Sequence, residues 1–544
     1  MQALSQITAW PLSAFCAEQF ATGNLLLPSS VSIFMRRNLP VLAFVAVLAV
    51  CHALAACADA LLGDRTAQIG KLMSTLNERG QFNGAVLVAK QGEIIYRKGF
   101  GKANFQTGVD FTPDTPSDIG SVTKQFTAMA IMILAERKKL NYDDPVSRYI
   151  PEFSSSAHLG RITLRELLTH TSGIPDFGDL GVDDPVDHKG LIAALLNKED
   201  ALSRPGLRYR YSNPGYELLG IVVERISGKR FGDFLEQEIF KPADMSSTFT
   251  YDRFGKRDSR TAVGYSQFGQ VDDGGPTANP GDGGIFSTVD DLFRWDQALY
   301  TNTPVRQSAL AEAFSAGKVE LGISTYGFGW NIESENGNKY LWHQGNHAGF
   351  RAFIGRRLAD RVTVIMQTNK GNSKRLDINA ALQNILAGKP FVLPEQSGAE
   401  ILYKTIHDSG IQAAMNTYRD LKNTKSADYD LGETELNTLG YQLLYGDKKV
   451  KEAIAVFKLN ANEHPVSSNA FDSLGEAYRR NGERDLAVSS YLTAVALNPA
   501  NGHAAAMLRK LNWHFPSRII AVAMAIAVFG LIGVGRRWYH QRKG

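Results

Sequence analysis

The stretch Gly120-Ser121-Val122-Thr123-Lys124 is followed by an apolar run that continues to Leu134. This pattern predicts a buried helix with Ser121 near its N-terminal end. Residues i and i+3 share one face of a helix, so Ser121 and Lys124 are expected to project into the same space. A serine hydroxyl becomes a nucleophile when a neighbouring base takes its proton, and a lysine that is buried beside it can lose its charge. The N-terminal end of the helix would add N–H groups and positive potential where an oxyanion forms.

An S-x-x-K pattern alone decides little, because it also occurs at Ser315 and Lys318, where no comparable helix follows. A second motif, Tyr211-Ser212-Asn213, lies in a polar, turn-like stretch before Pro214. The proline imposes a bend that can aim Tyr211 and Asn213 into a cleft. A phenol near cations can act as a base, and an asparagine amide offers a donor and an acceptor to a substrate amide.

A third motif, His343-Gln344-Gly345, lies at the end of a predicted strand. Glycine at this position permits the close approach of a substrate backbone. We expect His343 to face the site as a hydrogen-bond donor. The N–H of Asn346 is then expected to hold an oxyanion together with the N–H of Ser121. Similar patterns occur by chance at three further places in the chain, so the order and context of the motifs carry the interpretation. The chance matches are Tyr300 with Asn302, His188 with Gly190, and His347 with Gly349.

In this order, the three motifs resemble those of the penicillin-recognising serine hydrolases of the class C β-lactamase type, a family that includes DD-peptidases and esterases. The S-x-x-K, Y-x-N and K/H-x-G motifs of that family match Ser121 and Lys124, Tyr211 and Asn213, and His343 and Gly345. Two flanking phrases, Leu167 to Ile174 and Gly283 to Thr288, also look like the family. The resemblance covers about residues 75–370. It implies a mixed α/β fold and a covalent acyl-enzyme on Ser121.

One departure from the family concerns His343. Dedicated β-lactamases of the family usually carry lysine there, which is a fixed cation for a substrate carboxylate. A histidine near neutral pH is largely uncharged unless its pKa is shifted. The histidine form resembles the DD-peptidases and esterases of the family more, so we expect slow rather than efficient turnover of penicillins.

The apolar patterns predict an α+β fold in which one sheet is built from both ends of the domain. A hairpin is expected at residues 84–96, and further strands between residues 340 and 369. The sheet is expected to be antiparallel and flanked by helices. The helices between its early and late strands would form a separate, all-helical lobe. These helices are predicted at residues 164–173, where the helix would end at Gly173, and at 189–198, 214–227, 231–240 and 289–300, the last capped by Ser287 and Thr288.

Composition sets the outer limits of this interpretation. The chain has 544 residues, of which 21% are charged, and a formal net charge of only +4, which gives no argument for nucleic-acid binding. Its three cysteines, Cys16, Cys51 and Cys57, all precede residue 58, so the rest of the chain holds no disulfide and no thiolate metal site. We expect the predicted chemistry to need no metal and no cofactor.

Residues 1–60 are predicted to be a leader and signal segment with the natural start at Met35, because a basic start, an apolar run and small residues follow one another there. Leu54-Ala55-Ala56-Cys57 resembles a bacterial lipobox, in which Cys57 is lipidated; ordinary cleavage after Ala60 is the alternative. Residues 61–390 are expected to form the hydrolase domain, and residues 391–434 a linker with helical segments at 398–408 and 410–422.

Residues 435–512 are predicted to form tetratricopeptide-like repeats, since the spacing of small and aromatic residues from Leu474 to Pro499 fits one repeat; a generic helical hairpin is the alternative. Residues 513–544 would be a transmembrane helix and a basic tail. The uncharged run from Ile519 to Gly535 reaches the lower limit of about 17 residues for a membrane span, and basic residues after it place the C-terminus in the cytoplasm. A buried core helix is the alternative to this span.

These features together predict an exported, membrane-tethered serine hydrolase of the cell membrane, with its catalytic domain on the extracytoplasmic side. Its substrate would be a small molecule or a peptide with an amide or ester bond, of the DD-peptidase, esterase or β-lactamase type. A protein partner of the helical repeats is a further expectation. The alternative is a non-catalytic ligand sensor or scaffold that recruits partners through the repeats.

Overall fold

The computed structural model describes residues 63–181, 187–251, 260–274, 281–335, 337–424 and 427–511. The chain divides into two compact units, Met1–Ala67 and Gln68–Gly544, and the architecture below is that of the second unit. The predicted signal segment and lipobox at residues 1–60 and the predicted span at residues 519–535 lie outside the described residues. Within the described ranges, no helix has both the length and the apolar character that crossing a membrane requires.

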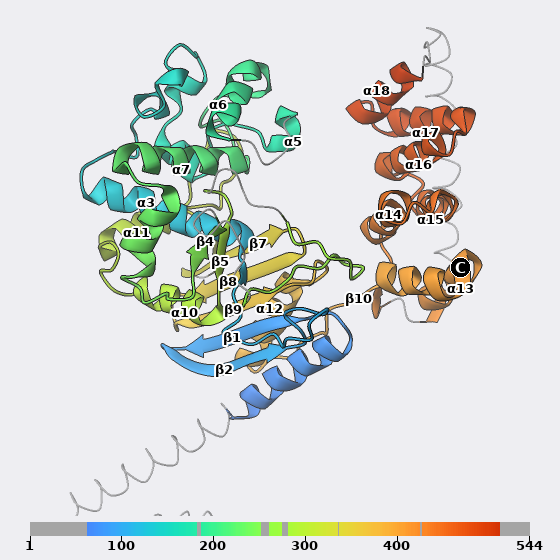
Figure 1. Cartoon of the computed structure of the whole chain (residues 1–544), viewed down its shortest axis with the longest axis horizontal. Coiled ribbons are helices and arrows are strands. Elements are labelled where there is room, and N and C mark those ends of the chain that lie inside the picture. The colour runs from blue at the N-terminus through green and yellow to red at the C-terminus, as the bar shows by residue number, and fades with distance from the viewer. Residues whose placement is uncertain are drawn as a thin grey trace, which may run out of the picture. The chain divides into compact units, whose positions relative to one another are not determined.

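A six-stranded antiparallel sheet forms the centre of the predicted hydrolase domain (Figure 1), with the order β2-β1-β9-β8-β7-β6. Its strands are β1 (Gly84–Lys90), β2 (Glu93–Phe100), β6 (Asn331–Glu335), β7 (Asn338–His347), β8 (Phe350–Arg357) and β9 (Val362–Thr368). The first strand pairs with the last, Gly84 lying opposite Thr368. The prediction of one sheet built from both ends of the domain is therefore confirmed.

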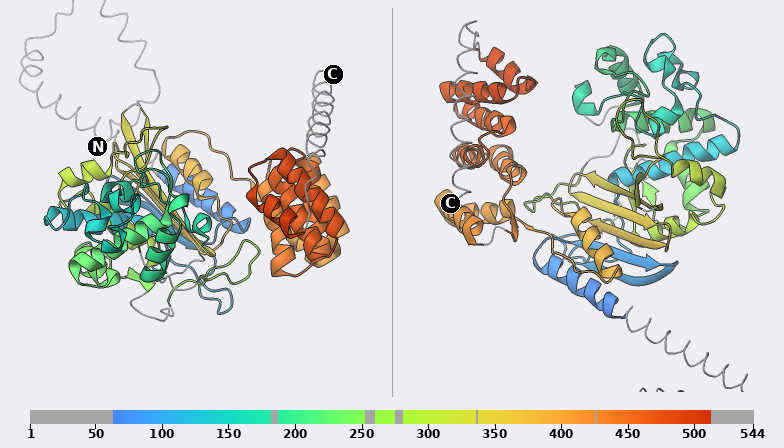
Figure 2. Two further views of the ribbon diagram at one scale, coloured as in Figure 1. Left: turned by 90° about the horizontal axis from the view of Figure 1, so that it is seen from above. Right: turned by 180° about the vertical axis from the view of Figure 1, so that it is seen from behind.

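Both faces of this sheet are covered, which explains why β1 and β9 are buried along almost their whole length. Alternate residues of β1 belong to different cores, as the two-residue period of a strand requires: Leu87 joins the core shared with the helical lobe, and Val86 the core on the opposite face. That second core contains Ile69 and Leu72 from a helix at residues 63–78, together with residues of α12 (Arg375–Leu386). Figures 1 and 2 show α12 on one side of the sheet and the helical lobe on the other.

The helical lobe is built from the middle of the domain. Its helices are α3 (Thr123–Glu136), α4 (Leu164–Leu168), α5 (Phe177–Leu180), α6 (His188–Asn197), α7 (Asn213–Ser227), α8 (Phe231–Leu235), α10 (Val289–Ala298) and α11 (Gln307–Ala313). Short helical turns lie at Gly120–Val122 (η1), Val146–Arg148, Pro151–Phe153, Leu159–Arg161, Glu199–Ala201 and Glu236–Phe240. A small three-stranded sheet has the order β3-β5-β4, formed by Ser117–Asp118 (β3), Ile285–Ser287 (β5) and Phe249–Thr250 (β4). Thr288 caps α10 by accepting the N–H of Asp291, as predicted.

The predicted helix at residues 164–173 was wrong at its C-terminal end. The helix begins with a capping box at Thr163 and ends at Leu168, five residues before the glycine that was expected to end it. The chain leaves the helix early because His170 takes a left-handed conformation with φ of 55°. Tertiary structure supplies the hydrogen bond that the helix loses, since the Tyr216 hydroxyl donates to the carbonyl oxygen of Leu168 at 2.7 Å.

The C-terminal region is helical. It comprises α13 (Gly398–Thr424), α14 (Glu433–Tyr441), a π-helical turn (Gln442–Gly446), α15 (Val450–Glu463), α16 (Ser468–Arg480), α17 (Arg484–Leu497) and α18 (Gly502–Lys510). The backbone of α13 is not helical at Gly410, where φ is 83°. This break agrees with the prediction of two helical segments, at residues 398–408 and 410–422. A Cβ at Gly475 would lie 2.8 Å from the Tyr491 ring, so this glycine permits a close helix contact. The assignment of these helices to tetratricopeptide repeats stays a prediction.

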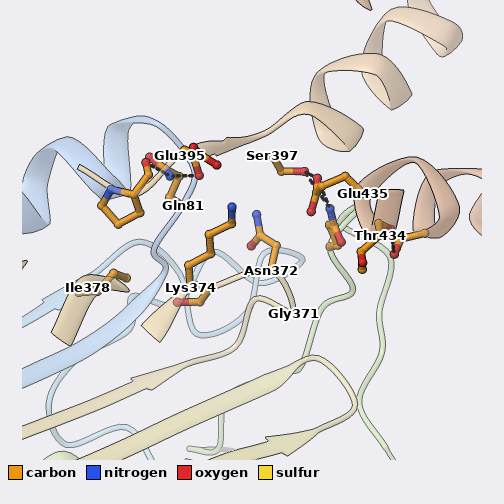
Figure 3. Close-up of a pocket in the computed structure, with 13 residues that line it drawn as sticks. Gln81, Gly371, Asn372, Lys374, Ile378, Glu395, Ser397, Thr434 and Glu435 are labelled. Carbon is orange, nitrogen blue, oxygen red and sulfur yellow. Dashed lines mark hydrogen bonds between the residues drawn. The ribbon is translucent and has the colours of Figure 1, made fainter. Parts of the chain in front are cut away.

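Polar contacts join this helical region to the loop that follows β9. Lys370 donates to Glu400 at 3.0 Å, and Lys374 donates to Asp430 at 2.7 Å. Beside these contacts lies a polar cavity of about 220 Å³ (Figure 3). None of the predicted catalytic or substrate-binding residues lines this cavity.

Candidate active site

Ser121 lies in η1, the single helical turn that leads directly into α3. Its neighbour one turn later, Lys124, is completely buried, whereas Ser121 itself is half-buried. The Nζ atom of Lys124 lies 3.0 Å from Oγ of Ser121. The predicted i, i+3 pair is therefore formed, with one group accessible and the other shielded from water.

Lys124 is held from three directions. Besides Ser121 Oγ, its Nζ donates to Oδ1 of Asn213 at 2.7 Å and to the carbonyl oxygen of Asp282 at 2.9 Å. A neutral lysine amine keeps two of these donations, to Asn213 and Asp282, and its lone pair can then accept the proton of Ser121. The ring of Tyr211 lies 5.0 Å from the same nitrogen, and that of Tyr216 lies 5.6 Å from it, so electron-rich faces complete its surroundings.

Asn213 is the first residue of α7, whose N-cap is Ser212. Its Oδ1 accepts from Lys124, and its Nδ2 donates to Oδ2 of Asp176 at 3.2 Å. The sequence predicted that this amide binds substrate, but in the structure it chiefly anchors Lys124, with one amide hydrogen left over. Asp176 is a site residue that the sequence analysis missed. Its position as the N-cap of α5 was the available signal.

Tyr211 lies beside Lys124. Within the described ranges, its hydroxyl makes no hydrogen bond to another side chain or backbone group. The side chain is partly exposed. Its oxygen is therefore available to a substrate or to the proton of Ser121.

Two glycines bring β7 against the nucleophile turn. A Cβ at Gly345 would lie 1.8 Å from the carbonyl oxygen of Ile119, and one at Gly120 would lie 2.8 Å from the backbone nitrogen of Asn346. Gly120 also has a φ of 48°, which other residues rarely adopt. The backbone of Asn346 therefore lies against the turn that carries Ser121, and its role as an oxyanion donor stays a prediction.

The side chain of Asn346 points away from this turn. Its Oδ1 accepts from Nη2 of the buried Arg375 at 2.6 Å, which holds β7 from the opposite face of the sheet. Burial, and then the neighbouring Arg351, lowers the pKa of Arg375 to about 9. On the side of the nucleophile, Asp118 accepts from the N–H of Gly120 at 2.7 Å and pairs with His347 at 2.8 Å. Polar contacts therefore hold both backbone segments, β7 at Asn346 and the turn before Ser121.

The expectation that His343 would act as a donor toward the site was wrong. Its Nδ1 lies 2.7 Å from the carbonyl oxygen of Gln344, which can only accept, so this nitrogen carries the proton. Its Nε2 is then the acceptor of the Tyr326 hydroxyl at 2.8 Å. Burial, reinforced by Lys124, lowers the pKa of His343 to about 3, so the ring is neutral. No sequence motif marked Tyr326 as its partner.

This buried neutral histidine makes the stability of the protein depend on pH. The pKa of His343 is lower in the folded than in the unfolded chain, so its contribution to stability is complete above about pH 6.5 and falls as the pH drops toward 3. Between about pH 6.5 and 3, the unfolding free energy of the wild type should fall as the pH falls. We expect His343→Gln to reduce the slope of this fall by about 1 kcal/mol per pH unit. Urea unfolding at several pH values measures this. His158→Gln, at an exposed site, is the matched control, and an equal change in both variants would contradict the assignment.

The chance matches at Ser315 and Tyr300 are not part of this constellation, whereas His347 pairs with Asp118 beside the nucleophile turn. Ser315 donates its hydroxyl to the carbonyl oxygen of Ala311 at 2.9 Å, and Lys318 lines a separate cavity. Tyr300 packs under the guanidinium of Arg356 at 4.3 Å. Tertiary structure thus separates these two chance matches from the true motifs.

The domain resembles known proteins over most of its length. A family model described as Beta-lactamase matches residues 69–389. Penicillin-binding protein 4* of Bacillus subtilis (strain 168) is 33% identical over 352 residues, which are 60% of this chain and 77% of that protein. The octameric penicillin-binding protein homologue from Pyrococcus abyssi superposes with a TM-score of 0.53 at 27% identity, covering 63% of this chain and 82% of that one. A penicillin binding protein from Bacillus halodurans gives 0.50 at 27% identity, covering 57% and 98%.

Proposed function

Because the chain belongs to the beta-lactamase family, which includes penicillin-binding protein homologues, we propose that it is a hydrolase that cleaves amide or ester bonds through an acyl-enzyme on Ser121. One observation carries the proposal: Nζ of the buried Lys124 lies 3.0 Å from Oγ of the half-buried Ser121. Ser121 lies in the turn η1, against which β7 packs at Gly345, and Lys124 lies in the first turn of α3.

In the proposed reaction, Oγ of Ser121 attacks the substrate carbonyl carbon while its proton passes to the Lys124–Tyr211 pair. The N–H groups of Ser121 and Asn346 stabilise the oxyanion of the tetrahedral intermediate. When this intermediate collapses, the bond to the leaving group breaks, and that group takes the proton from the same pair. Water then attacks the carbonyl carbon of the acyl-enzyme. The ester bond to Ser121 breaks, Oγ regains its proton from the same pair, and the acid is released.

The state of His343 bears on the substrate. A neutral ring that accepts from Tyr326 offers no fixed cation to a substrate carboxylate at β7. The proposed substrates are peptides or amides of the cell-wall type and small esters. We expect β-lactams to be turned over slowly, because dedicated β-lactamases of the family usually carry a lysine where this chain has His343. We also propose that the protein is exported and tethered to the cell membrane, on the basis of the signal-like residues 35–60 and the apolar run at residues 519–535.

Incubation of the full-length protein with a fluorophosphonate, followed by intact mass measurement, is expected to show one adduct that Ser121→Ala abolishes. Ser315→Ala, the serine of the chance motif, is the matched control and should label normally. A stable penicillin adduct in a parallel sample would favour a DD-peptidase-like site, and fluorophosphonate labelling alone would favour an esterase or amidase. Labelling of intact cells with a membrane-impermeant fluorophosphonate tests the extracytoplasmic location.

No adduct from folded protein would contradict the hydrolase and favour a ligand sensor. That alternative has the same binding pocket but no turnover, and its helical region would recruit a partner. Retention of labelling in Ser121→Ala would instead contradict the assignment of the nucleophile.

A further inference from the structure

His170 is buried within the group of aromatic rings that surrounds the catalytic lysine. The residue follows α4 in a left-handed conformation, with φ of 55°, and has no exposed surface. Its ring centroid lies 4.2 Å from that of Tyr211, 4.5 Å from that of Tyr326 and 4.9 Å from that of Tyr216. The histidine is thus the central ring of a cluster whose other members contact Lys124 or His343.

The same histidine binds the backbone on both sides of Tyr211. Its carbonyl oxygen accepts from the N–H of Arg210 at 2.8 Å, and its Nδ1 accepts from the N–H of Ser212 at 3.2 Å. Two bonds to residues 210 and 212, and a ring against the side chain of residue 211, leave Tyr211 little freedom to move.

The ring of His170 is neutral and carries a single proton. Since Nδ1 accepts a hydrogen bond, the ring proton is on Nε2, which has no hydrogen-bond partner in the described part of the chain. Burial, then the charge of Lys124 and the ring of His343, holds the pKa of His170 well below its usual value. Protonation would also remove the acceptor that Ser212 requires. The ring is therefore a fixed neutral support.

We propose that His170 is a positioning residue for Tyr211, holding the backbone and the phenol ring of this predicted base in the orientation that proton transfer from Ser121 needs. The proposal rests on the proposed function, in which Tyr211 takes part in acylation. The proposal gives a role to one residue of the family-like segment Leu167 to Ile174, which lies outside the three catalytic motifs.

The two contacts of His170 can be removed separately. Asparagine tolerates a positive φ and keeps an oxygen acceptor for Ser212, but it has no ring to pack on Tyr211. Phenylalanine keeps the ring but lacks the acceptor and strains the backbone. We expect His170→Asn to slow fluorophosphonate labelling of Ser121 about 10- to 100-fold, the effect of a small misplacement of a catalytic group.

A double-mutant cycle in the full-length protein distinguishes positioning from general destabilisation. Labelling rates are compared for wild type, His170→Asn, Tyr211→Phe and the double variant, with thermal unfolding confirming that each is folded. If His170 acts through Tyr211, then His170→Asn costs less than about twofold once Tyr211 has lost its hydroxyl. The same cycle with His170→Phe applies if His170→Asn does not fold.

Equal losses from His170→Asn in both backgrounds would overturn the inference, and so would a wild-type rate in the single variant. Both outcomes leave labelling of the wild type intact and hence leave the proposed function standing. Failure of the wild type to label would overturn the proposed function instead, and the inference with it. A nonadditive cycle in folded, labelled protein supports both.

Discussion

Replacement of Lys124 by alanine is expected to lower the rate of Ser121 acylation about 10³-fold, the largest catalytic effect of any single change that leaves the nucleophile in place. The variant removes the group that lies 3.0 Å from Oγ and is itself completely buried. Bulk water does not replace it readily, because the position is closed by α3, the Asp282 carbonyl and the Tyr211 ring. Stopped-flow measurement of fluorophosphonate labelling gives the rate directly.

Lys318→Ala is the matched control, because Lys318 has the same spacing from a serine but lies exposed and away from the site. It should label at the wild-type rate. The Lys124 variant also leaves Oδ1 of Asn213 without its donor, so a loss of stability of about 1–3 kcal/mol is expected alongside. Labelling of Lys124→Ala within about tenfold of wild type would contradict the catalytic role of the lysine.

Gly345→Ala is expected to abolish most of the activity through the backbone rather than through any side-chain chemistry. The new methyl group would lie 1.8 Å from the carbonyl oxygen of Ile119 and 3.2 Å from the nitrogen of Ser121. Because backbone cannot yield as a flexible side chain does, β7 must move away from the nucleophile turn. Labelling should fall by about 100-fold or more as the oxyanion donors separate, with a loss of about 2 kcal/mol in unfolding free energy.

Gly178→Ala provides the comparison, since nothing lies within 4 Å of the added methyl group and the backbone there has no positive φ. This control should retain both labelling and stability. Thermal unfolding and labelling measured on the same samples separate the two effects. If Gly345→Ala lost stability but labelled normally, the close approach of β7 would be structural and unrelated to the oxyanion site.

Much of the fold follows from local patterns of the chain. The hairpin at residues 84–96, the late strands, the cap at Thr288 and the break at Gly410 are each determined by neighbouring residues, through apolar periodicity or turn chemistry. The predicted end of the helix at Gly173 was wrong because that end is not determined by neighbouring residues. Its true end at Leu168 depends on a hydroxyl from Tyr216, which lies 48 residues further along the chain.

The candidate site likewise has features that neighbouring residues determine and features that depend on distant residues. The spacing of Ser121 and Lys124 predicted their contact, because helix geometry alone brings i and i+3 together. The direction of hydrogen bonding at His343 depends on Tyr326, a residue with no motif of its own, and the sequence analysis therefore expected a donor where the structure has an acceptor.

The sequence by itself determined the nucleophile motif, the strands that make up the sheet, and the family to which the chain belongs, because these depend on residues near one another in the chain or on motifs in a set order. Only the tertiary structure decided that Asn213 anchors Lys124, that His170 supports Tyr211 and that His343 is neutral. Each of these depends on burial and on hydrogen-bond partners from distant segments, and a protonation state or a donor–acceptor direction is defined only when all the groups around it are in place.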